Sequence, residues 1–220
     1  MNIEPVAIFH SPLKEKFGVP RQSGLAPDLP GEVRFVPPYD APDTLRGLEG
    51  FDYCWLIWGF SLNEGTGFHS TVRPPRLGGN ERVGVFASRS PFRPNGLGLS
   101  CVRIKEVAPG LIRVLGADLA DGTPVYDVKP YVAYADCRPG AASGFVDASK
   151  WEPLEVEIPE EIAAELPSGS IEALIQVLSQ DPRPQYQEDP ERVYGMAFGA
   201  LNVKFCVRGG RVIVQSAEKC

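Results

Sequence analysis

Turn-forming residues are spread densely along this chain. Its 220 residues include 23 glycines and 22 prolines, together about a fifth of the total, without a collagen-like repeat. Because glycine and proline shape turns and interrupt helices, we expect many short strands joined by loops rather than a helical bundle. A hydrophobic fraction of 43% with 23% charged residues is ordinary for a globular protein and argues against intrinsic disorder.

The first two thirds of the sequence carry strand patterns. Short apolar or alternating runs bounded by turn residues predict strands at 6–9, 33–36, 83–87, 102–104 and 111–115. The nearly continuous apolar stretch FDYCWLIWGF at 51–60 predicts a strand buried on both faces, although periodicity alone leaves a buried helix open. We therefore expect a mainly β domain, an antiparallel sheet or barrel, over residues 1–152.

The pattern changes near residue 153. A strand is predicted at 154–158, a short helix at 160–166 and a second helix at 171–178, for which Ser168 or Ser170 offers an N-cap. Alternating runs on both sides of Gly209 and Gly210 predict a hairpin with a tight primed turn. We therefore expect a second, small α+β domain over residues 153–220.

Membrane and metal signals are weak. The longest nearly uncharged apolar stretch, 53–62, is about half of the roughly 20 residues that a spanning helix needs, and the first ten residues do not resemble a signal peptide. The five cysteines are scattered without a CxxC pair, so the close ligand pairs of a structural zinc site are missing. We expect a cytoplasmic protein with reduced cysteines and neither a membrane segment nor a metal.

The formal net charge of −6 conceals an asymmetry. Residues 73–93 hold five arginines against one acid, whereas residues 152–191 hold eleven acids against one base. An acidic protein does not bind nucleic acid indiscriminately, but a local arginine cluster can still bind phosphate. We interpret 73–93 as a candidate anion-binding stretch, with ordinary surface arginines as the alternative.

The usual nucleotide-binding motifs do not fit. The nearest approach to GxGxxG, at 96–101, lacks the third glycine and the following helix, so a Rossmann-type enzyme is not supported. Instead, GVFASRSPFRPNGLGLS at 84–100 combines hydrogen-bond donors with turn residues, which suits a polar ligand or phosphate and equally suits a proline-rich turn. In DGTPVYDVKPY at 121–131, Asp127 and Lys129 would lie on the same face of an extended strand. There they could form either a salt bridge, the commoner outcome, or an acid/base pair.

Four segments occur together in a characteristic order: SPLKEKFGVPRQSGL, TVRPPRLGGNERVGVFASRSPFRPN, DGTPVYDVKPY and QDPRPQY. With them, nearly the whole chain resembles the TsaA-like (TrmO-type) tRNA methyltransferase family. The resemblance implies an antiparallel β-barrel that binds S-adenosylmethionine, and a homodimer with cofactor sites near the subunit interface. It also implies methylation of N6 of threonylcarbamoyl-adenosine, the nucleoside at position 37, just 3′ of the anticodon, in threonine tRNAs.

The same resemblance assigns cofactor-binding positions. They are Pro20, Arg21, Gln22, Leu62, Asn63, Arg89, Leu99 near a turn, Asp121, Gly122, Thr123 and Pro124. Relatives often have arginine where His10 stands and histidine where Ser61 stands, so a histidine general base at that strand end is missing here. PNGLG at 94–98 replaces the usual PNPIG, which we expect to alter loop stiffness more than chemistry.

The acceptor nitrogen N6 must lose a proton when it is methylated. Asp127 is the first candidate to accept that proton, and Lys129 could offer its positive charge to the carbonyl or carboxylate of the modification. Asp121 is the rival candidate for the proton, although an aspartate in a turn is more often structural. For the anticodon loop of tRNA, the candidate phosphate contacts are Arg73, Arg76 and Arg93. Tyr131, Tyr39 and Phe92 are candidates for base stacking, with core packing as the alternative.

The sequence is also compatible with two other functions. One is a non-catalytic barrel that binds S-adenosylmethionine or RNA and regulates a partner, which would consume no cofactor. The other is a hydrolase using Ser88, Ser90 or Ser100, which lacks a nearby histidine and would require a Ser–Lys arrangement.

Overall fold

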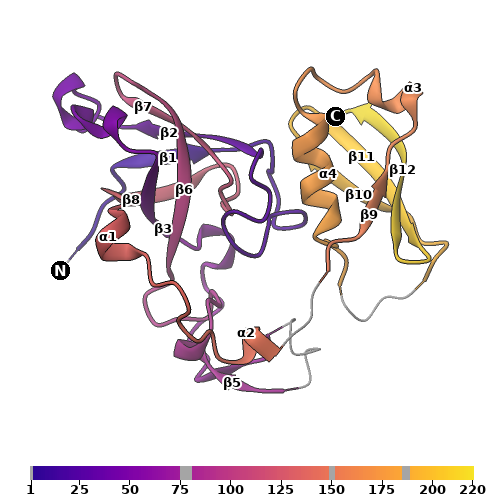
Figure 1. Cartoon of the computed structure of the whole chain (residues 1–220), viewed down its shortest axis with the longest axis horizontal. Helices are drawn as coiled ribbons and strands as arrows, with labels where there is room; N and C mark the ends of the chain where they lie inside the picture. Colours follow the sequence, from indigo (N-terminus) through magenta and orange to yellow (C-terminus); the bar gives the residue numbers. More distant parts are fainter. Residues whose placement is uncertain (1, 75–80, 149–151, 185–188) are drawn as a thin grey trace.

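The computed structural model describes residues 2–74, 81–148, 152–184 and 189–220 and contains two main sheets (Figure 1). Six strands close into an antiparallel barrel in the order β1-β2-β7-β6-β3-β8. Their bounds are Ala7–His10 for β1, Pro30–Phe35 for β2, Tyr53–Gly59 for β3, Leu97–Ala108 for β6, Leu111–Leu115 for β7 and Thr123–Pro130 for β8. The predicted antiparallel barrel is therefore confirmed.

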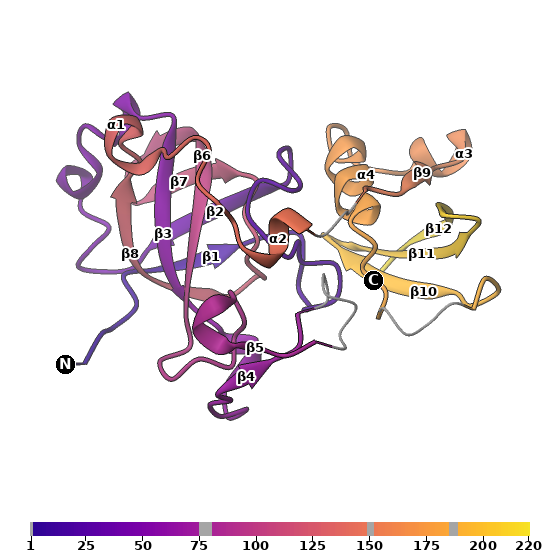
Figure 2. The same ribbon diagram turned by 60° about the horizontal axis from the view of Figure 1, so that its bottom comes forward.

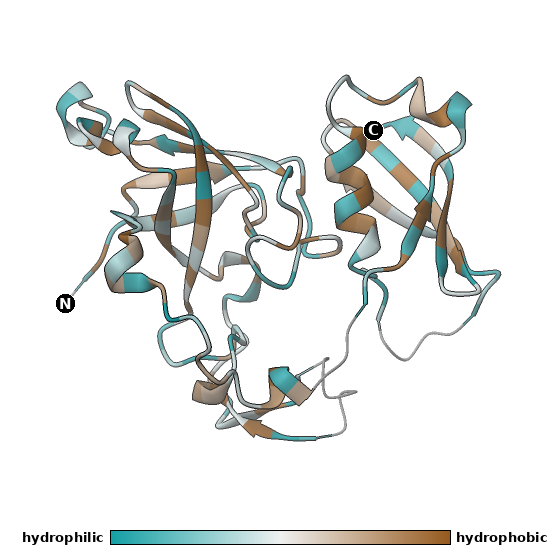
Figure 3. Cartoon of the chain, viewed as in Figure 1, coloured by the Kyte–Doolittle hydropathy of each residue, from teal (hydrophilic) through white to brown (hydrophobic). Residues whose placement is uncertain are grey.

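Strand β3 is buried on one face only, which corrects the prediction of a strand buried on both faces. Cys54, Leu56 and Trp58 point into the barrel and are at most 7% exposed, whereas Tyr53 faces outward and is 43% exposed. The apolar run misleads because aromatic residues also occupy the outer face. In Figure 3 the long strand β6, by contrast, carries brown and teal bands.

Two further boundaries differ from the sequence prediction. The strand expected at 83–87 is only Val83–Gly84 (β5), because Val85–Ala87 turns as a 3-10 helix that Ser88 closes with a hydrogen bond to the Val85 carbonyl. The strand expected at 102–104 is the middle of the long strand β6, so Leu99 lies within this strand, shortly after the turn at 94–95.

Short elements surround the barrel. Strand β4 (Thr71–Val72) pairs with β5 as a small arm, and helices α1 (Ala133–Asp136) and α2 (Phe145–Ala148) follow the barrel. Further 3-10 helices lie at Pro42–Leu45, Leu48–Gly50 and Ser61–Asn63. Figure 2 shows the β4–β5 arm and α2 on the side of the barrel from which the chain continues to the second sheet.

The second sheet has the strand order β10-β11-β12-β9 and is covered by α4 (Figure 1). The bounds are Glu155–Glu157 for β9, Glu160–Ala163 for α3, Ile171–Ser179 for α4, Tyr194–Phe198 for β10, Leu201–Arg208 for β11 and Arg211–Lys219 for β12. Gly209 and Gly210 both have positive φ, 56° and 75°, as the predicted primed turn requires.

The helices depart from the prediction at their ends. Helix α3 stops at Ala163 rather than at residue 166, because the following residues form a tighter turn before Pro167. Ser170 occupies the N-cap position of α4, but its hydroxyl donates to the Pro167 carbonyl at 2.7 Å and does not cap the helix.

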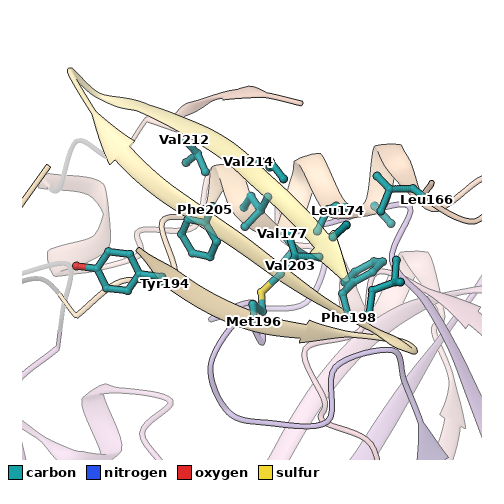
Figure 4. Packing of buried hydrophobic residues seen from close by; sticks show 14 of the residues in the cluster. Leu166, Leu174, Val177, Tyr194, Met196, Phe198, Val203, Phe205, Val212 and Val214 are labelled. Carbon is teal, nitrogen blue, oxygen red and sulfur yellow. The ribbon is translucent and has the colours of Figure 1, made fainter. Parts of the chain in front are cut away.

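The barrel has one hydrophobic core, and the second sheet has another, which it shares with α4. In the second core, Leu174 and Val177 of α4 face Val203 and Phe205 of the sheet (Figure 4). Leu13, Ala26 and Leu29, from the loop between β1 and β2, are buried in this same core. The loop therefore anchors the barrel to the second sheet. The proposed boundary between residues 152 and 153 stays a prediction.

Two kinds of feature are absent from the described ranges. Within them, no helix combines the length and apolar character needed to cross a bilayer. The same residues contain no group of three or more His, Cys, Asp or Glu side chains placed to hold a metal ion.

Candidate active site

A large cleft opens where the barrel meets α4. It has a volume of about 1440 Å³ and is lined by the β1–β2 loop, the end of β3, the β4–β5 arm, the loop before β6, the turn before β8, α2 and the end of α4. Sites for small molecules usually have volumes of about 300–1,000 Å³. The cleft is therefore large enough for a cofactor and part of a second substrate.

Arg89 and Gln22 meet inside this cleft. The guanidinium of Arg89, in the loop before β6, donates from Nη1 to Oε1 of Gln22, in the β1–β2 loop, at 2.5 Å. This contact fixes the positively charged guanidinium of Arg89 at the wall of the cleft. A guanidinium placed in this way can bind a carboxylate or a phosphate.

Asp118 is a cleft residue that the sequence did not single out. Its Oδ1 accepts a hydrogen bond from the Ser100 hydroxyl at 2.5 Å, and Ser100 Oγ accepts one from the Trp58 indole N–H at 2.9 Å. Burial raises the pKa of the Asp118 carboxyl above its ordinary value, because desolvation outweighs the hydrogen bond from Ser100 and the attraction of Arg89. The residue lies three positions before the DGTP motif, and its surroundings arise from long-range contacts.

The serine- and arginine-rich loop before β6 is held by its own side chains. Arg93 Nη1 donates to the carbonyl oxygens of Val85 and Ser88 at 3.2 and 2.6 Å, and its guanidinium lies 5.7 Å from the centre of the Phe86 ring. Ser88 Oγ donates to the Val85 carbonyl and accepts from the N–H of Ser90. These contacts give Arg93 and Ser88 structural roles in the loop, and they make Ser88 a poor candidate for a hydrolase nucleophile.

Most of the predicted cofactor residues meet in the cleft. Eight of them line it: Pro20, Arg21, Gln22, Leu62, Asn63, Arg89, Leu99 and Thr123. Asp121, Gly122 and Pro124 do not line it. The Asp121 carboxylate instead accepts hydrogen bonds from the Ser11 N–H at 3.2 Å and pairs with His10 Nδ1 at 3.1 Å. The imidazole of His10 thus supplies a partner for Asp121.

Asp127 and Lys129 lie on the outer face of β8, outside the cleft. Lys129 Nζ is 2.8 Å from Asp127 Oδ2, and both side chains are about half exposed, at 61% and 47%. Across the sheet, Leu99 opposes Ile57, and Ile57 opposes Asp127. Strands are spaced about 4.8 Å apart, so Asp127 is roughly 10 Å from Leu99 at the edge of the cleft.

The candidate tRNA contacts are divided between the cleft and the outer face. Arg73 and Arg93 line the cleft, whereas Arg76 lies outside the described residues. Tyr131 packs against Tyr53 on the outer barrel face, with ring centres 6.2 Å apart. Phe92 stacks on His69 inside the cleft at 4.7 Å with the rings nearly parallel, and this pair forms a flat aromatic surface.

The fold and the site define a β-barrel protein with a large, arginine-bearing cleft, a class distinct from Rossmann enzymes. Comparison with known proteins is more specific. The family model of the tRNA-methyltransferase O N-terminal domain matches residues 8–137, and that of the TrmO C-terminal domain matches residues 151–220. The chain belongs to the tRNA-methyltransferase O family.

Individual relatives agree with this assignment. The chain is 40% identical to the tRNA (adenine(37)-N6)-methyltransferase of Escherichia coli (strain K12), over 93% of this chain and 92% of the relative. It is also 40% identical to a putative S-adenosylmethionine-dependent methyltransferase of Pseudomonas aeruginosa, over 92% and 90% of the two chains. The crystal structure of TrmO from Pseudomonas aeruginosa superposes with a TM-score of 0.79 at 32% identity, covering 99% of this chain and 98% of that one.

Proposed function

We propose that this chain transfers the methyl group of S-adenosylmethionine to N6 of threonylcarbamoyl-adenosine at position 37 of threonine tRNAs, as a homodimer in the cytoplasm. As a member of its family, the chain is an S-adenosylmethionine-dependent tRNA (adenine-N6)-methyltransferase. The threonylcarbamoyl acceptor, the threonine tRNAs, the homodimer and the location are the further parts of this proposal. The observation that supports it most is the meeting of Arg89 and Gln22, from two separate family motifs, in one cleft.

The chemistry of the cleft fits the cofactor. The guanidinium of Arg89 suits a carboxylate, the amide of Gln22 can bond hydroxyl groups, and Leu62 and Leu99 offer apolar surface. When bound, S-adenosylmethionine supplies an activated methyl group. The role of the chain is to hold the acceptor in line with that group, because alignment provides much of the acceleration in a direct displacement.

For the acceptor nucleoside, the proposed catalytic residues are Asp127 and Lys129. Leu99 lines the cleft and is 53% exposed, and the row Leu99–Ile57–Asp127 runs from the cleft edge across the outer face. The base would rest over Ile57, with N6 between Leu99 at the cleft edge and Asp127 on the next strand, about 5 Å from each, and its bulky threonylcarbamoyl group would extend along β8 toward Lys129. Asp127 would then accept the N6 proton, and Lys129 would bind the carbonyl or carboxylate of the modification.

The cleft also carries groups that suit an RNA loop. Arg73 and Arg82 line it from the β4–β5 arm, and the Phe92–His69 stack offers an aromatic surface. Phe86 in the neighbouring loop is 74% exposed. Unpaired anticodon-loop bases stack on aromatic rings, while arginines bind the phosphates on either side.

Labelled-methyl transfer tests the proposed function. Total tRNA is prepared with and without the threonylcarbamoyl modification and incubated with the protein and methyl-labelled S-adenosylmethionine. The proposal predicts label in tRNA only when the modification is present. Equal labelling of both preparations would contradict the proposed acceptor. Cofactor binding without any transfer would instead favour a regulatory, non-catalytic barrel.

A further inference from the structure

The cleft presents an acid as well as an arginine. Asp118 and Asp181 are the carboxylates among its described lining residues. Asp181 is engaged by Arg183, whose Nε and Nη2 lie 2.8 and 2.9 Å from the two carboxylate oxygens. Asp118 accepts from the neutral hydroxyl of Ser100, and among the described ion pairs it has no direct cationic partner. Asp118 is therefore the carboxylate in this cleft whose charge is not already matched by a direct ion pair.

Rigid elements fix the position of the Asp118 carboxylate. Ser100 on β6 is 1% exposed, and Trp58 on β3, which donates to it, is 7% exposed. Gly98 makes room for this arrangement, because a Cβ at that position would lie 2.3 Å from the Trp58 indole. Hydrogen bonds from the backbone at Asp118 and Ser23 also stabilise the carboxylate. A group held in this way is pre-organised for a ligand.

The charges of Asp118 and Arg89 match one end of the proposed cofactor. The two side chains are close enough for Arg89 to favour the ionised form of Asp118. An α-amino acid carries a carboxylate and an ammonium on the same carbon, so a cation and an anion side by side can pair with both of its charges. Burial raises the pKa of Asp118, and a bound ammonium would offset that effect by stabilising the charged form.

We infer that Asp118 binds the α-ammonium group of S-adenosylmethionine, with Arg89 facing the carboxylate of the same amino acid end. This inference rests on the proposed function for the identity of the cofactor. It adds a binding residue that lies outside the four family motifs. Asp118 would fix the amino acid end of the ligand and leave the sulfonium and its methyl group directed toward the edge of the cleft.

Ligand pairs that differ only in the amino group test this inference. S-adenosylhomocysteine and 5′-S-(3-carboxypropyl)-5′-thioadenosine, which lacks the α-amino group, are titrated calorimetrically into wild-type protein and Asp118→Asn. We expect the wild type to prefer S-adenosylhomocysteine by roughly 10- to 100-fold, as a charge-assisted contact provides. Asp118→Asn should bind both ligands almost equally.

Control variants make the result specific. Asp181→Asn removes the other cleft carboxylate and should keep the wild-type preference for the amino group. If Asp118→Asn does not fold, as judged by circular dichroism, Asp118→Ser replaces it and should also lose the preference. The inference is overturned if Asp118→Asn keeps the preference for the amino group. The same holds if the substitution weakens the binding of both ligands by an equal factor, which would indicate a contact to another part of the ligand or a structural role.

The outcome is separable from that of the proposed function. If the wild type methylates modified tRNA while Asp118→Asn keeps its preference for the amino group, the inference fails and the proposed function stands. If the wild type shows the preference but transfers no methyl group, the reverse holds. Failure of the wild type to bind either ligand would overturn the cofactor assignment and with it the role of Asp118.

Discussion

Arg89 and Gln22 are 67 residues apart in the chain, yet the guanidinium of one donates to the side-chain amide oxygen of the other at 2.5 Å. The contact joins the β1–β2 loop to the loop before β6. Because the β1–β2 loop is also anchored in the second core through Leu13, Ala26 and Leu29, the position of Gln22 depends on both parts of the protein. The second sheet therefore helps to shape a cleft that the barrel alone would not complete.

Replacing Arg89 by alanine should weaken binding of S-adenosylmethionine by roughly 10- to 150-fold, since a charge-assisted contact contributes about 1.5–3 kcal/mol. Calorimetric titration measures the change. Arg103→Ala is a matched control, because Arg103 is exposed on β6 and does not line the cleft. An Arg89→Ala protein that binds as tightly as the wild type would exclude Arg89 from the cofactor site.

Arg73→Ala should reduce the salt dependence of tRNA binding. If Arg73 contacts phosphate, the slope of log affinity against log salt should fall in magnitude by roughly 0.7 to 0.9. Fluorescence anisotropy with labelled tRNA at several salt concentrations gives this slope. Arg211→Ala, on β12 and already paired with Glu155 and Glu157, should leave it unchanged. Equal slopes for Arg73→Ala and wild type would show that Arg73 does not contact RNA.

Asp127→Asn separates catalysis from a structural ion pair. The change keeps the shape of the side chain but removes its basicity, so single-turnover methyl transfer should fall by roughly 10²- to 10⁴-fold with cofactor affinity little changed. An exposed ion pair contributes at most about 1 kcal/mol, so the melting temperature should change little. Normal turnover together with reduced thermal stability would mean that the Asp127–Lys129 pair is only structural.

The stability of the protein should depend on pH through Asp118. Burial, opposed by Ser100 and Arg89, raises the pKa of this carboxyl in the folded state above its ordinary value of 3.8. The native state therefore binds the proton more tightly, and this contribution to stability is lost as pH rises through the folded pKa. Asp118→Asn should be more stable than wild type at pH 7, and the difference should shrink toward pH 4. Urea unfolding across this range tests it, and a pH-independent difference would contradict it.

Local patterns were sufficient for several parts of the fold. The turn at Gly209 and Gly210 and the strand at Leu111–Leu115 follow from short-range residue chemistry, and both are confirmed. The sequence does not reveal the outer face of β3, because the outward-facing Tyr53, Trp55 and Ile57 are also large and uncharged. Composition therefore could not show which face of β3 meets the core.

The site was only partly accessible from the sequence. Arg89 and Gln22 were expected to meet the same ligand, and they lie in contact in the cleft. Asp118 was missed because its significance depends on Ser100 and Trp58, which reach it from other strands. No spacing rule along the chain connects these three residues. Their association follows only from closure of the barrel.

Nucleoside mass spectrometry of threonine tRNA tests the central claim most directly. Modified tRNA is incubated with the protein and S-adenosylmethionine carrying a deuterated methyl group, then digested to nucleosides and fragmented. The account predicts the labelled methyl on N6 of threonylcarbamoyl-adenosine from position 37, and no labelled nucleoside from tRNA that lacks the modification. Label on a different nucleoside, or a threonylcarbamoyl-adenosine that stays unlabelled while the protein binds the cofactor, would contradict it.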